Sequence, residues 1–216
     1  MPKHNNVPKS LDEKSLAVNA RKLAASEPDF ARLLQRYGTP PLWAREPGFA
    51  TLIHIILEQQ VSLASAKAAY NRLCAAVSPL TPEGLLTLDD AALKTIGFSR
   101  QKTLYSRLLA EAILTRQLDL ELLPAMSDDE VRFVLKQRKG IGDWTADIYL
   151  LMALRRPDVW PPGDLALLVA LQKLKQLPAR PSPREFAEMG VQWKPYRAIA
   201  ARFLWHYYLS ERNYIV

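Results

Sequence analysis

The chain has 216 residues, of which 49% are hydrophobic, so it can bury a core in one domain or in two small lobes and is not disordered. Lys and Arg number 29 and Asp and Glu 22, and the resulting net charge of +7 favours a polyanionic partner. No apolar run reaches the roughly 18 residues of a membrane span, and Met1–Ser10 lacks the apolar segment of a secretory signal. We therefore expect no membrane partner.

Cysteine and histidine are too sparse for metal chemistry. Cys74 is the single cysteine, which excludes an internal disulfide and a metal cluster held by several cysteines. The three histidines are scattered along the chain, and we expect structural roles for His54 and His206. No cofactor for catalysis is expected.

Apolar residues recur at three- and four-residue spacing along almost the whole chain, which predicts an all-α protein. Prolines, glycines and capping residues set the expected helix ends. The expected helices are Ser10–Ala25, Glu27–Tyr37, Gly48–Gln59, Val61–Val77, Thr81–Leu85, Asp89–Ile96, Ser99–Thr115, a short segment at Asp119–Leu123, Ser127–Lys139, Trp144–Leu154, Asp164–Lys175, Pro183–Met189 and Pro195–Leu209.

The stretch KGIGDW, residues 139–144, places two of the chain's eight glycines at a helix entrance. Between two predicted helices, this Gly-Ile-Gly turn makes a helix–hairpin–helix. Free amides at the start of the second helix suit an anion such as a DNA phosphate, and Ile141 is expected to plug the turn into the core. A C-cap glycine before an ordinary helix is the alternative. The doubled glycine and the basic flank favour phosphate binding.

The stretch VWPPGDLALL, residues 159–168, places Asp164 at the start of a predicted helix. Alone, an N-cap aspartate explains it. Together with the hairpin about twenty residues earlier, it resembles the helix–hairpin–helix superfamily of DNA base-excision glycosylases. Three more stretches are similar to that superfamily. They are ILEQQVSLASAKAAYNRL (residues 56–73, the wedge-bearing helix–turn–helix), IGFSRQKTLYSRLLAEAI (96–113, a Lys-containing helix) and WKPYRAIAARFLW (193–205, the closing helix).

The subfamily most resembled is the 3-methyladenine DNA glycosylase II type, which acts on alkylated bases. The resemblance implies a two-lobed fold with an active-site cleft between the lobes. One lobe would span residues 48–155, and the other would combine residues 1–47 with 156–216. Trp144 stands where strand-cleaving members carry a lysine nucleophile, so no lyase activity is expected. Helix-like sequence from Ser10 resembles the compact form without an extra N-terminal domain.

The resemblance also implies a set of site residues. Asp164 would be the catalytic carboxylate, which stabilises positive charge on the sugar and activates water. The other roles are a base pocket of Trp144, Trp205, Tyr149 and Trp160; a wedge of Gln59 and Gln60; phosphate contacts from Gly140, Gly142, Thr145, Lys139 and Lys102; and a Na+ or K+ ion held, when DNA is bound, by the main-chain carbonyls of Lys136, Arg138 and Ile141.

Each role has a plainer alternative. The aromatic residues could pack in the core, Gln59 and Gln60 could simply end a helix, and the basic residues could form a solvated face. If Gln60 is the wedge, it either intercalates or hydrogen-bonds the orphaned partner base.

The resemblance implies a monofunctional glycosylase that acts as a monomer on double-stranded DNA with damaged bases. It would work in the bacterial cytoplasm at the nucleoid, or in a eukaryotic nucleus. A glycosylase for deaminated or oxidised bases and a non-catalytic helix–hairpin–helix DNA-binding protein are the alternatives. A helical interaction scaffold would leave the paired glycines unexplained.

Overall fold

The computed structural model describes residues 10–212, so the expectation for Met1–Ser10 falls outside the described residues except at Ser10. Within that range, α-helices and two short 3-10 helices are the regular elements, and the all-α prediction is confirmed. No helix of the described range is long and apolar enough to cross a membrane. The described chain divides into two compact units, each of which is considered by itself.

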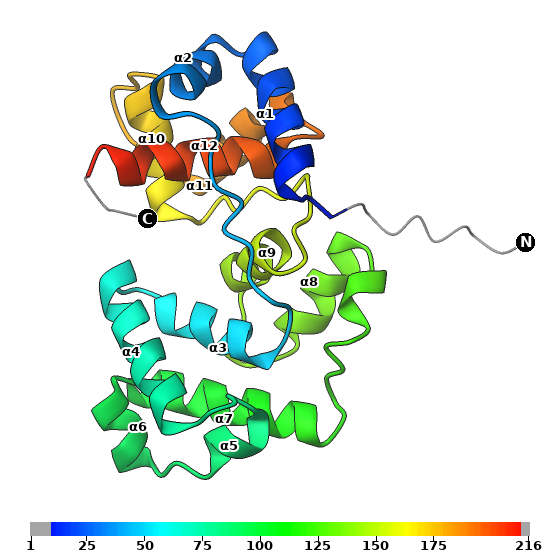
Figure 1. Cartoon of the computed structure of the whole chain (residues 1–216), viewed down its shortest axis with the longest axis vertical. Helices are drawn as coiled ribbons and strands as arrows, with labels where there is room; N and C mark the ends of the chain where they lie inside the picture. The colour runs from blue at the N-terminus through cyan, green and yellow to red at the C-terminus, as the bar shows by residue number, and fades with distance from the viewer. Residues whose placement is uncertain (1–9, 213–216) are drawn as a thin grey trace, which may run out of the picture. The chain divides into compact units, whose positions relative to one another are not determined.

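Unit 1 comprises residues 45–149. Its elements are α3 (Phe49–Glu58), α4 (Leu63–Ala76), α5 (Pro82–Leu86), α6 (Asp90–Ile96), α7 (Arg100–Leu114), η1 (Leu123–Ala125), α8 (Asp128–Lys136) and most of α9 (Asp143–Met152). The helix α3 packs against α4 and α7, and α7 packs against α5 and α6 (Figure 1). Four α3 residues are fully buried: Leu52, Ile53, Ile55 and Ile56. This apolar helix is the core of unit 1.

Unit 2 comprises residues 10–44 and 150–212 of the described chain. Its elements are α1 (Glu13–Ser26), α2 (Pro28–Tyr37), α10 (Leu165–Leu174), α11 (Pro183–Met189), η2 (Gly190–Trp193) and α12 (Arg197–Ser210), with the last turn of α9. The helix α12 contacts α1, α2 and α10, and its residues 198–205 are all buried. A helix with no solvent face for two turns is the centre of a core, and α12 organises unit 2 around itself.

Helix ends follow the capping residues closely. Ser127 and Glu130 form the expected capping box at the start of α8. The last turn of α8 was expected to continue to Lys139, but the helix ends at Lys136, where Arg138 N donates to Leu135 O at 3.0 Å and begins the hairpin. Similarly, α4 begins at Leu63 because Ser62 caps it, not at Val61.

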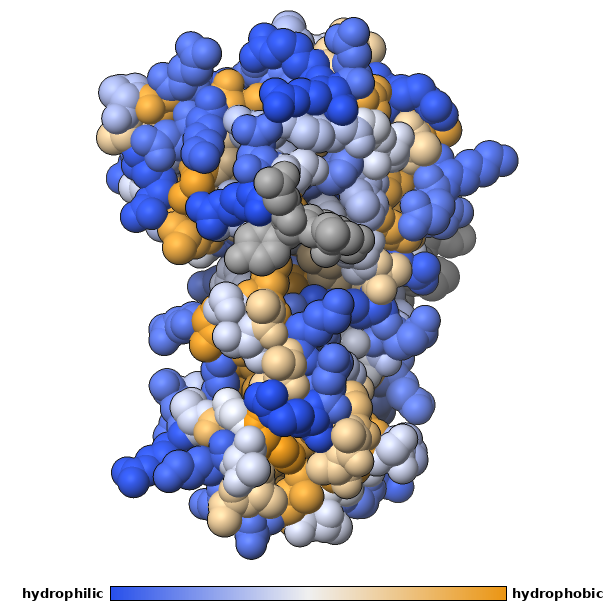
Figure 2. Space-filling model, turned by 60° about the vertical axis from the view of Figure 1, so that its left-hand side comes forward, coloured by the Kyte–Doolittle hydropathy of each residue, from blue (hydrophilic) through white to orange (hydrophobic). Residues whose placement is uncertain are grey.

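The visible surface of the chain is mostly polar. On the face drawn in Figure 2, hydrophilic side chains cover most of both units and hydrophobic residues appear in patches between them. Among the exposed large hydrophobics are Val61, in the turn between α3 and α4, and Leu63, the first residue of α4, at 46% and 53% exposure. This turn and the hairpin between α8 and α9 contain residues expected to contact DNA.

Candidate functional site

The hairpin of unit 1 joins α8 to α9 through Gly140, Ile141 and Gly142. Ile141 is 5% exposed, as expected for a residue that plugs the turn into the core, and its amide donates to Arg138 O at 3.1 Å. The first hydrogen bond of α9 runs from Ala146 N to Gly142 O at 3.0 Å. The amides of the first turn of α9 lie before this first helical hydrogen bond. Amides in that position at a helix N-terminus can bind an anion.

The two glycines have different structural requirements. Gly140 has φ 92°, and a Cβ placed on it would lie 2.7 Å from the Tyr105 Cβ and closer still to the Tyr105 ring. Gly142 has no positive φ, is exposed, and a Cβ on it would meet nothing within 4 Å. The fold thus requires a glycine at position 140. It leaves space in front of Gly142 for a group from outside the chain.

Gln59 connects the turn after α3 to the hairpin. Its side-chain Nε2 donates to Gly140 O and to Thr145 Oγ1, both at 2.9 Å. Thr145 is 2% exposed, so its hydroxyl faces this brace and not solvent. Gln59 and Gln60 were expected together at the wedge. In the structure Gln59 is half-buried and engaged with the hairpin, whereas Gln60 is exposed with φ 58°.

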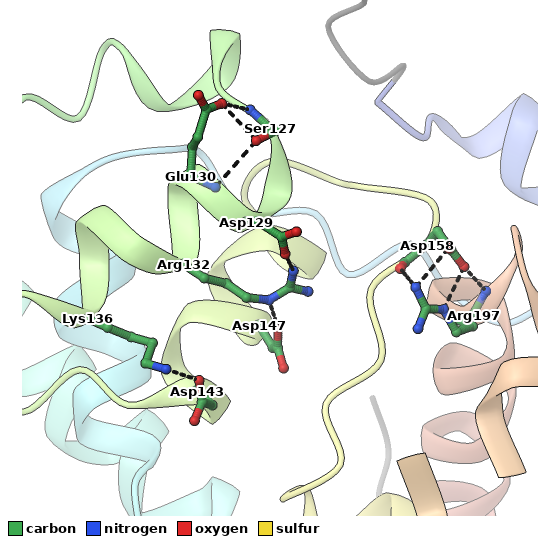
Figure 3. A network of polar contacts seen from close by, with 9 residues as sticks. All are labelled: Ser127, Asp129, Glu130, Arg132, Lys136, Asp143, Asp147, Asp158 and Arg197. Atoms are coloured by element: carbon green, nitrogen blue, oxygen red, sulfur yellow. Dashed lines mark hydrogen bonds and ion pairs between the residues drawn. The ribbon is translucent and has the colours of Figure 1, made fainter. Parts of the chain in front are cut away.

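Ion pairs hold the helices on either side of the hairpin (Figure 3). Arg132 on α8 contacts Asp147 on α9, with Nε to Oδ1 at 2.7 Å, and also Asp129 at 3.0 Å. Burial raises the pKa of the Asp147 carboxyl above its ordinary value, and Arg132 beside it acts in the opposite direction. Lys136 and Asp143, at the two ends of the hairpin, pair at 2.5 Å on the surface. The hairpin is therefore fixed by side chains from both flanking helices.

The basic residues expected at phosphates differ in exposure. Lys139 is exposed, and so is Arg100, a further basic residue at the start of α7. Lys102 is half-buried, its Nζ donates to Leu57 O at 2.7 Å, and burial lowers the pKa of its ammonium. Because Leu57 lies in the last turn of α3, Lys102 satisfies a carbonyl at that helix end and supports the turn that carries Gln59 and Gln60.

The acidic centre of unit 2 is Asp164, which is 7% exposed. It caps α10: its Oδ1 accepts from Leu167 N at 3.0 Å, and the same oxygen accepts from the Trp205 indole Nε1 at 3.2 Å. A buried carboxylate needs such donors, and the N-terminal end of α10 adds a favourable dipole. The structure brings together Asp164 and Trp205, which are 41 residues apart.

The other aromatic residues expected at the base have varied surroundings. Trp144 is half-buried in the first turn of α9. Tyr149 is fully buried and accepts from Gly48 N at 3.0 Å, and burial raises its pKa to about 12. Trp160 stacks on Phe186 with 4.3 Å between ring centroids and donates from its indole to Phe186 O at 2.9 Å. Tyr149 and Trp160 thus make core contacts within their own units.

Known proteins resemble this chain in sequence and fold. The model of the HhH-GPD superfamily base excision DNA repair protein matches residues 53–195. The chain belongs to this superfamily. The alkylbase DNA glycosidase-like protein mag2 of Schizosaccharomyces pombe is 30% identical over 159 residues, which are 71% of this chain and 75% of mag2. The putative DNA-3-methyladenine glycosylase YfjP of Bacillus subtilis is 28% identical over 192 residues, 83% of this chain and 66% of YfjP.

A solved structure of an HhH-GPD relative shares the fold. The 3-methyladenine DNA glycosylase Mag1 of Schizosaccharomyces pombe, in complex with abasic DNA, superposes with a TM-score of 0.80 at 28% identity. The match covers 86% of this chain and 94% of that one. The helix–hairpin–helix glycosylase fold predicted from the sequence is therefore confirmed.

The carbonyls expected to hold a monovalent cation in this HhH-GPD hairpin can be tested for fit. Arg138 O accepts the turn bond from Ile141 N, which uses one of its two lone pairs. The carbonyls of Lys136 and Ile141 accept no backbone hydrogen bond from the described residues outside helices. Oxygen ligands are those that hard cations prefer, so the three carbonyls fit such an ion. The cation itself stays a prediction.

Sequence reasoning missed Trp43, which lies beside Trp205 in unit 2 with 6.3 Å between ring centroids and 78° between planes. Trp43 precedes Pro47 in the connection between α2 and α3. It also missed Arg202, which is fully buried and donates to Leu42 O, next to Trp43. A tryptophan in a connection bounded by prolines was the only signal for Trp43. The buried arginine had none.

Proposed function

We propose that the chain is a monofunctional DNA glycosylase that rotates an alkylated purine out of duplex DNA and hydrolyses its N-glycosidic bond. The observation that carries this proposal is Asp164, a buried carboxylate capping α10 and held by the Trp205 indole. The relatives named as 3-methyladenine glycosylases support 3-methyladenine as a substrate. We propose 7-methylguanine as a second alkylated purine of the same class.

Asp164 supplies the chemistry in this proposal. Positive charge develops on the sugar as the bond from C1′ to the base stretches, and a carboxylate in a dry site stabilises it. The same carboxylate orients the attacking water and accepts its proton. An alkylated purine already carries a positive charge and leaves without being protonated. No strong general acid is then required.

Unit 1 supplies DNA binding in this proposal. The hairpin amides and the space in front of Gly142 receive a phosphate. The exposed turn with Gln60 and Val61 enters the duplex where the base has left the stack. Lys139 and Arg100 add attraction that does not depend on sequence and weakens as salt rises. A cation held by the main-chain carbonyls of Lys136, Arg138 and Ile141 would add positive charge that favours phosphate binding at the hairpin.

Trp144 explains why we propose hydrolysis without strand cleavage. A lyase needs an amine that forms a Schiff base with the abasic sugar. An indole cannot do this. We further propose that the enzyme acts as a monomer. Its place of action would be the nucleoid in a bacterium or the nucleus in a eukaryote.

The test is Asp164→Asn on duplex DNA methylated with dimethyl sulfate. Asparagine caps helices as well as aspartate does, so α10 is retained while the negative charge is lost. Base release should fall at least about 100-fold, with DNA affinity and melting temperature kept. The matched control is Asp89→Asn, since Asp89 also caps a helix and accepts from Ala92 N at 2.7 Å. That variant should keep its activity.

The products decide between this proposal and its rivals. Abasic sites without strand breaks, together with free methylated purines, support it. Undiminished release by Asp164→Asn would remove Asp164 from the mechanism. If the unaltered protein releases deaminated or oxidised bases instead, the substrate class is wrong. If it releases no base from any damaged duplex but still binds DNA, it is a non-catalytic DNA-binding protein.

A further inference from the structure

The helix α8 has an apolar side that the core of unit 1 does not cover. Val131 and Leu135 of this helix are fully buried. Phe133 lies two positions from each of them, so at about 100° per residue it points away from both. It is 68% exposed, the highest value among the exposed large hydrophobics of the described residues. Such a ring in solvent is typical of an interaction surface.

Phe133 belongs to an open groove of about 430 Å³, formed by unit 1 alone. Its lining residues are Met126, Asp129, Glu130, Phe133 and Val134. They recur at spacings of three and four, which places them along one side of α8 and of the turn before it. The groove therefore offers an apolar floor of helix length with two carboxylates at its edge.

The edge of the groove is acidic, although the chain has a net charge of +7. Residues 117–131 contain five acidic side chains and no Lys or Arg: Asp119, Glu121, Asp128, Asp129 and Glu130. The side chain of Asp129 is 97% exposed. Hydrogen bonds from Ser127 hold the pKa of Glu130 below its ordinary value, so Glu130 is charged at pH 7. This charge lies beside the exposed ring.

The contacts within α8 leave this negative charge in excess. Arg132 pairs with Asp129 at 3.0 Å, but it also pairs with Asp147 at 2.7 Å, so one guanidinium serves two carboxylates (Figure 3). Glu130 accepts only from the neutral amide and hydroxyl of Ser127 among the hydrogen bonds drawn there. An acidic edge repels DNA phosphates. The ligand of the groove is therefore not DNA.

We infer that this groove docks a partner protein through a basic amphipathic helix of the partner. The apolar face of that helix covers Phe133 and Val134, and Lys or Arg side chains beside it meet Asp129 and Glu130. Charge complementarity selects this occupant, because a neutral or acidic helix would desolvate the two carboxylates without pairing them. The hairpin follows the last turn of α8 and is not part of the groove, so partner and DNA can bind together.

Fluorescence anisotropy with defined peptides tests this inference. The probe is a labelled peptide of Ala, Leu and Lys with Leu on one helical face and Lys beside it, about 16 residues long so that it can form a helix. A second peptide carries Glu in place of every Lys, and a third has the sequence of residues 1–9, MPKHNNVPK. The Lys peptide should bind at least about 10-fold more tightly than the Glu peptide.

Variants of the groove separate its apolar and charged parts. Phe133→Ala should weaken binding of the Lys peptide about 5- to 30-fold, the loss expected for an aromatic anchor. The double variant Asp129→Asn with Glu130→Gln keeps the helix cap, because glutamine also closes a capping box, and should weaken binding about 3- to 10-fold. The control is Val191→Ala, which changes an exposed hydrophobic of η2 outside the groove and should leave binding unchanged.

The outcomes are distinct when melting temperatures and duplex affinities are measured for the same variants. Unchanged melting and unchanged duplex affinity in Phe133→Ala, with weaker peptide binding, support the inference. Equal binding of the Lys and Glu peptides, or full peptide binding by Phe133→Ala, overturns it. Loss of duplex affinity in Phe133→Ala would assign the groove to DNA. Tighter binding of the peptide with residues 1–9 would assign it to this chain's own segment, and a dimer that Phe133→Ala dissociates would assign it to a second copy. Each of these three results also overturns the inference.

Discussion

The hairpin of unit 1 and the carboxylate of unit 2 are built on opposite principles. The hairpin presents main-chain groups around the exposed Gly142, and side chains such as Gln59 and Arg132 only hold it in place. The carboxylate presents one charged side chain from a buried position, where the Leu167 amide and the Trp205 indole donate to it. Backbone groups suit the binding of phosphates, because phosphates are the same at every base sequence of DNA. A single carboxylate suits one reacting bond.

This difference predicts which substitutions the hairpin tolerates and which the surroundings of Asp164 tolerate. The hairpin should depend on backbone shape and steric space and depend little on the identity of its exposed side chains. The carboxylate should depend on individual polar atoms. Substitutions that separate stability, DNA affinity and rate therefore test the comparison.

The largest effect is expected at Gly140. Gly140→Ala adds a Cβ at φ 92° that lies 2.7 Å from the Tyr105 Cβ, which rotation of the Tyr105 ring does not move. We expect a loss of about 2–5 kcal/mol in the free energy of unfolding, from left-handed strain and overpacking together. Urea unfolding measures it.

Gly142→Ala is the matched control for that loss. Its Cβ meets nothing within 4 Å and its φ is not positive, so stability should be unchanged or raised by up to about 1 kcal/mol. Its DNA affinity should nevertheless fall, because the methyl group occupies the space left for a phosphate. Equal stability of the two variants, or full DNA affinity in Gly142→Ala, would contradict the proposed role of the hairpin.

The next effect is expected at Trp205. Trp205→Phe keeps an aromatic ring but removes the N–H that donates to Asp164 at 3.2 Å. A hydrogen bond to a charged group contributes about 1.5–3 kcal/mol, so single-turnover base release should slow about 10- to 100-fold while affinity for undamaged DNA stays the same.

Trp193→Phe controls for a general effect on unit 2. The Trp193 indole also donates to a carboxylate, Glu27, at 3.2 Å. That variant should lose stability without a selective loss of rate. Equal slowing of base release in Trp205→Phe and Trp193→Phe would contradict a specific role for the hydrogen bond to Asp164.

The sequence predicts the elements because the signals for them are local. Two helix caps show this: Ser127 pairs with Glu130 at the start of α8, and Asp164 accepts from Leu167 N at the start of α10. In both, the two residues are three positions apart, so their spacing in the sequence is enough to predict the cap. Apolar periodicity likewise predicts a helix at Pro195–Leu209, where the structure has α12. The end of α8 was placed three residues too far because the turn beginning at Arg138 has no distinct local signal.

The sequence does not predict contacts between distant segments. Arg202 donates to Leu42 O across 160 residues, and Gln59 donates to Gly140 O across 81. Both acceptors are main-chain carbonyls, which every residue carries, so no side-chain pattern identifies the partner. The positions of Trp43 beside Trp205 and of Gln59 beside the hairpin therefore emerged only from the structure.

The smallest effect is expected at the two glutamines of the turn after α3. Gln59→Ala removes two hydrogen bonds of 2.9 Å and should cost about 1–2 kcal/mol of stability. Gln60→Ala changes an exposed side chain and should stay within about 0.5 kcal/mol of the unaltered protein. If Gln60 fills the space left by the flipped base, Gln60→Ala should also reduce base flipping, which is measured by 2-aminopurine fluorescence beside the lesion.

The variant Gln59→Glu separates the roles of the two glutamines further, because a carboxylate accepts from the Thr145 hydroxyl but cannot donate to Gly140 O. It should be at least as unstable as Gln59→Ala, and an unfolding curve like that of Gln60→Ala would show that Gln59 does not brace the hairpin.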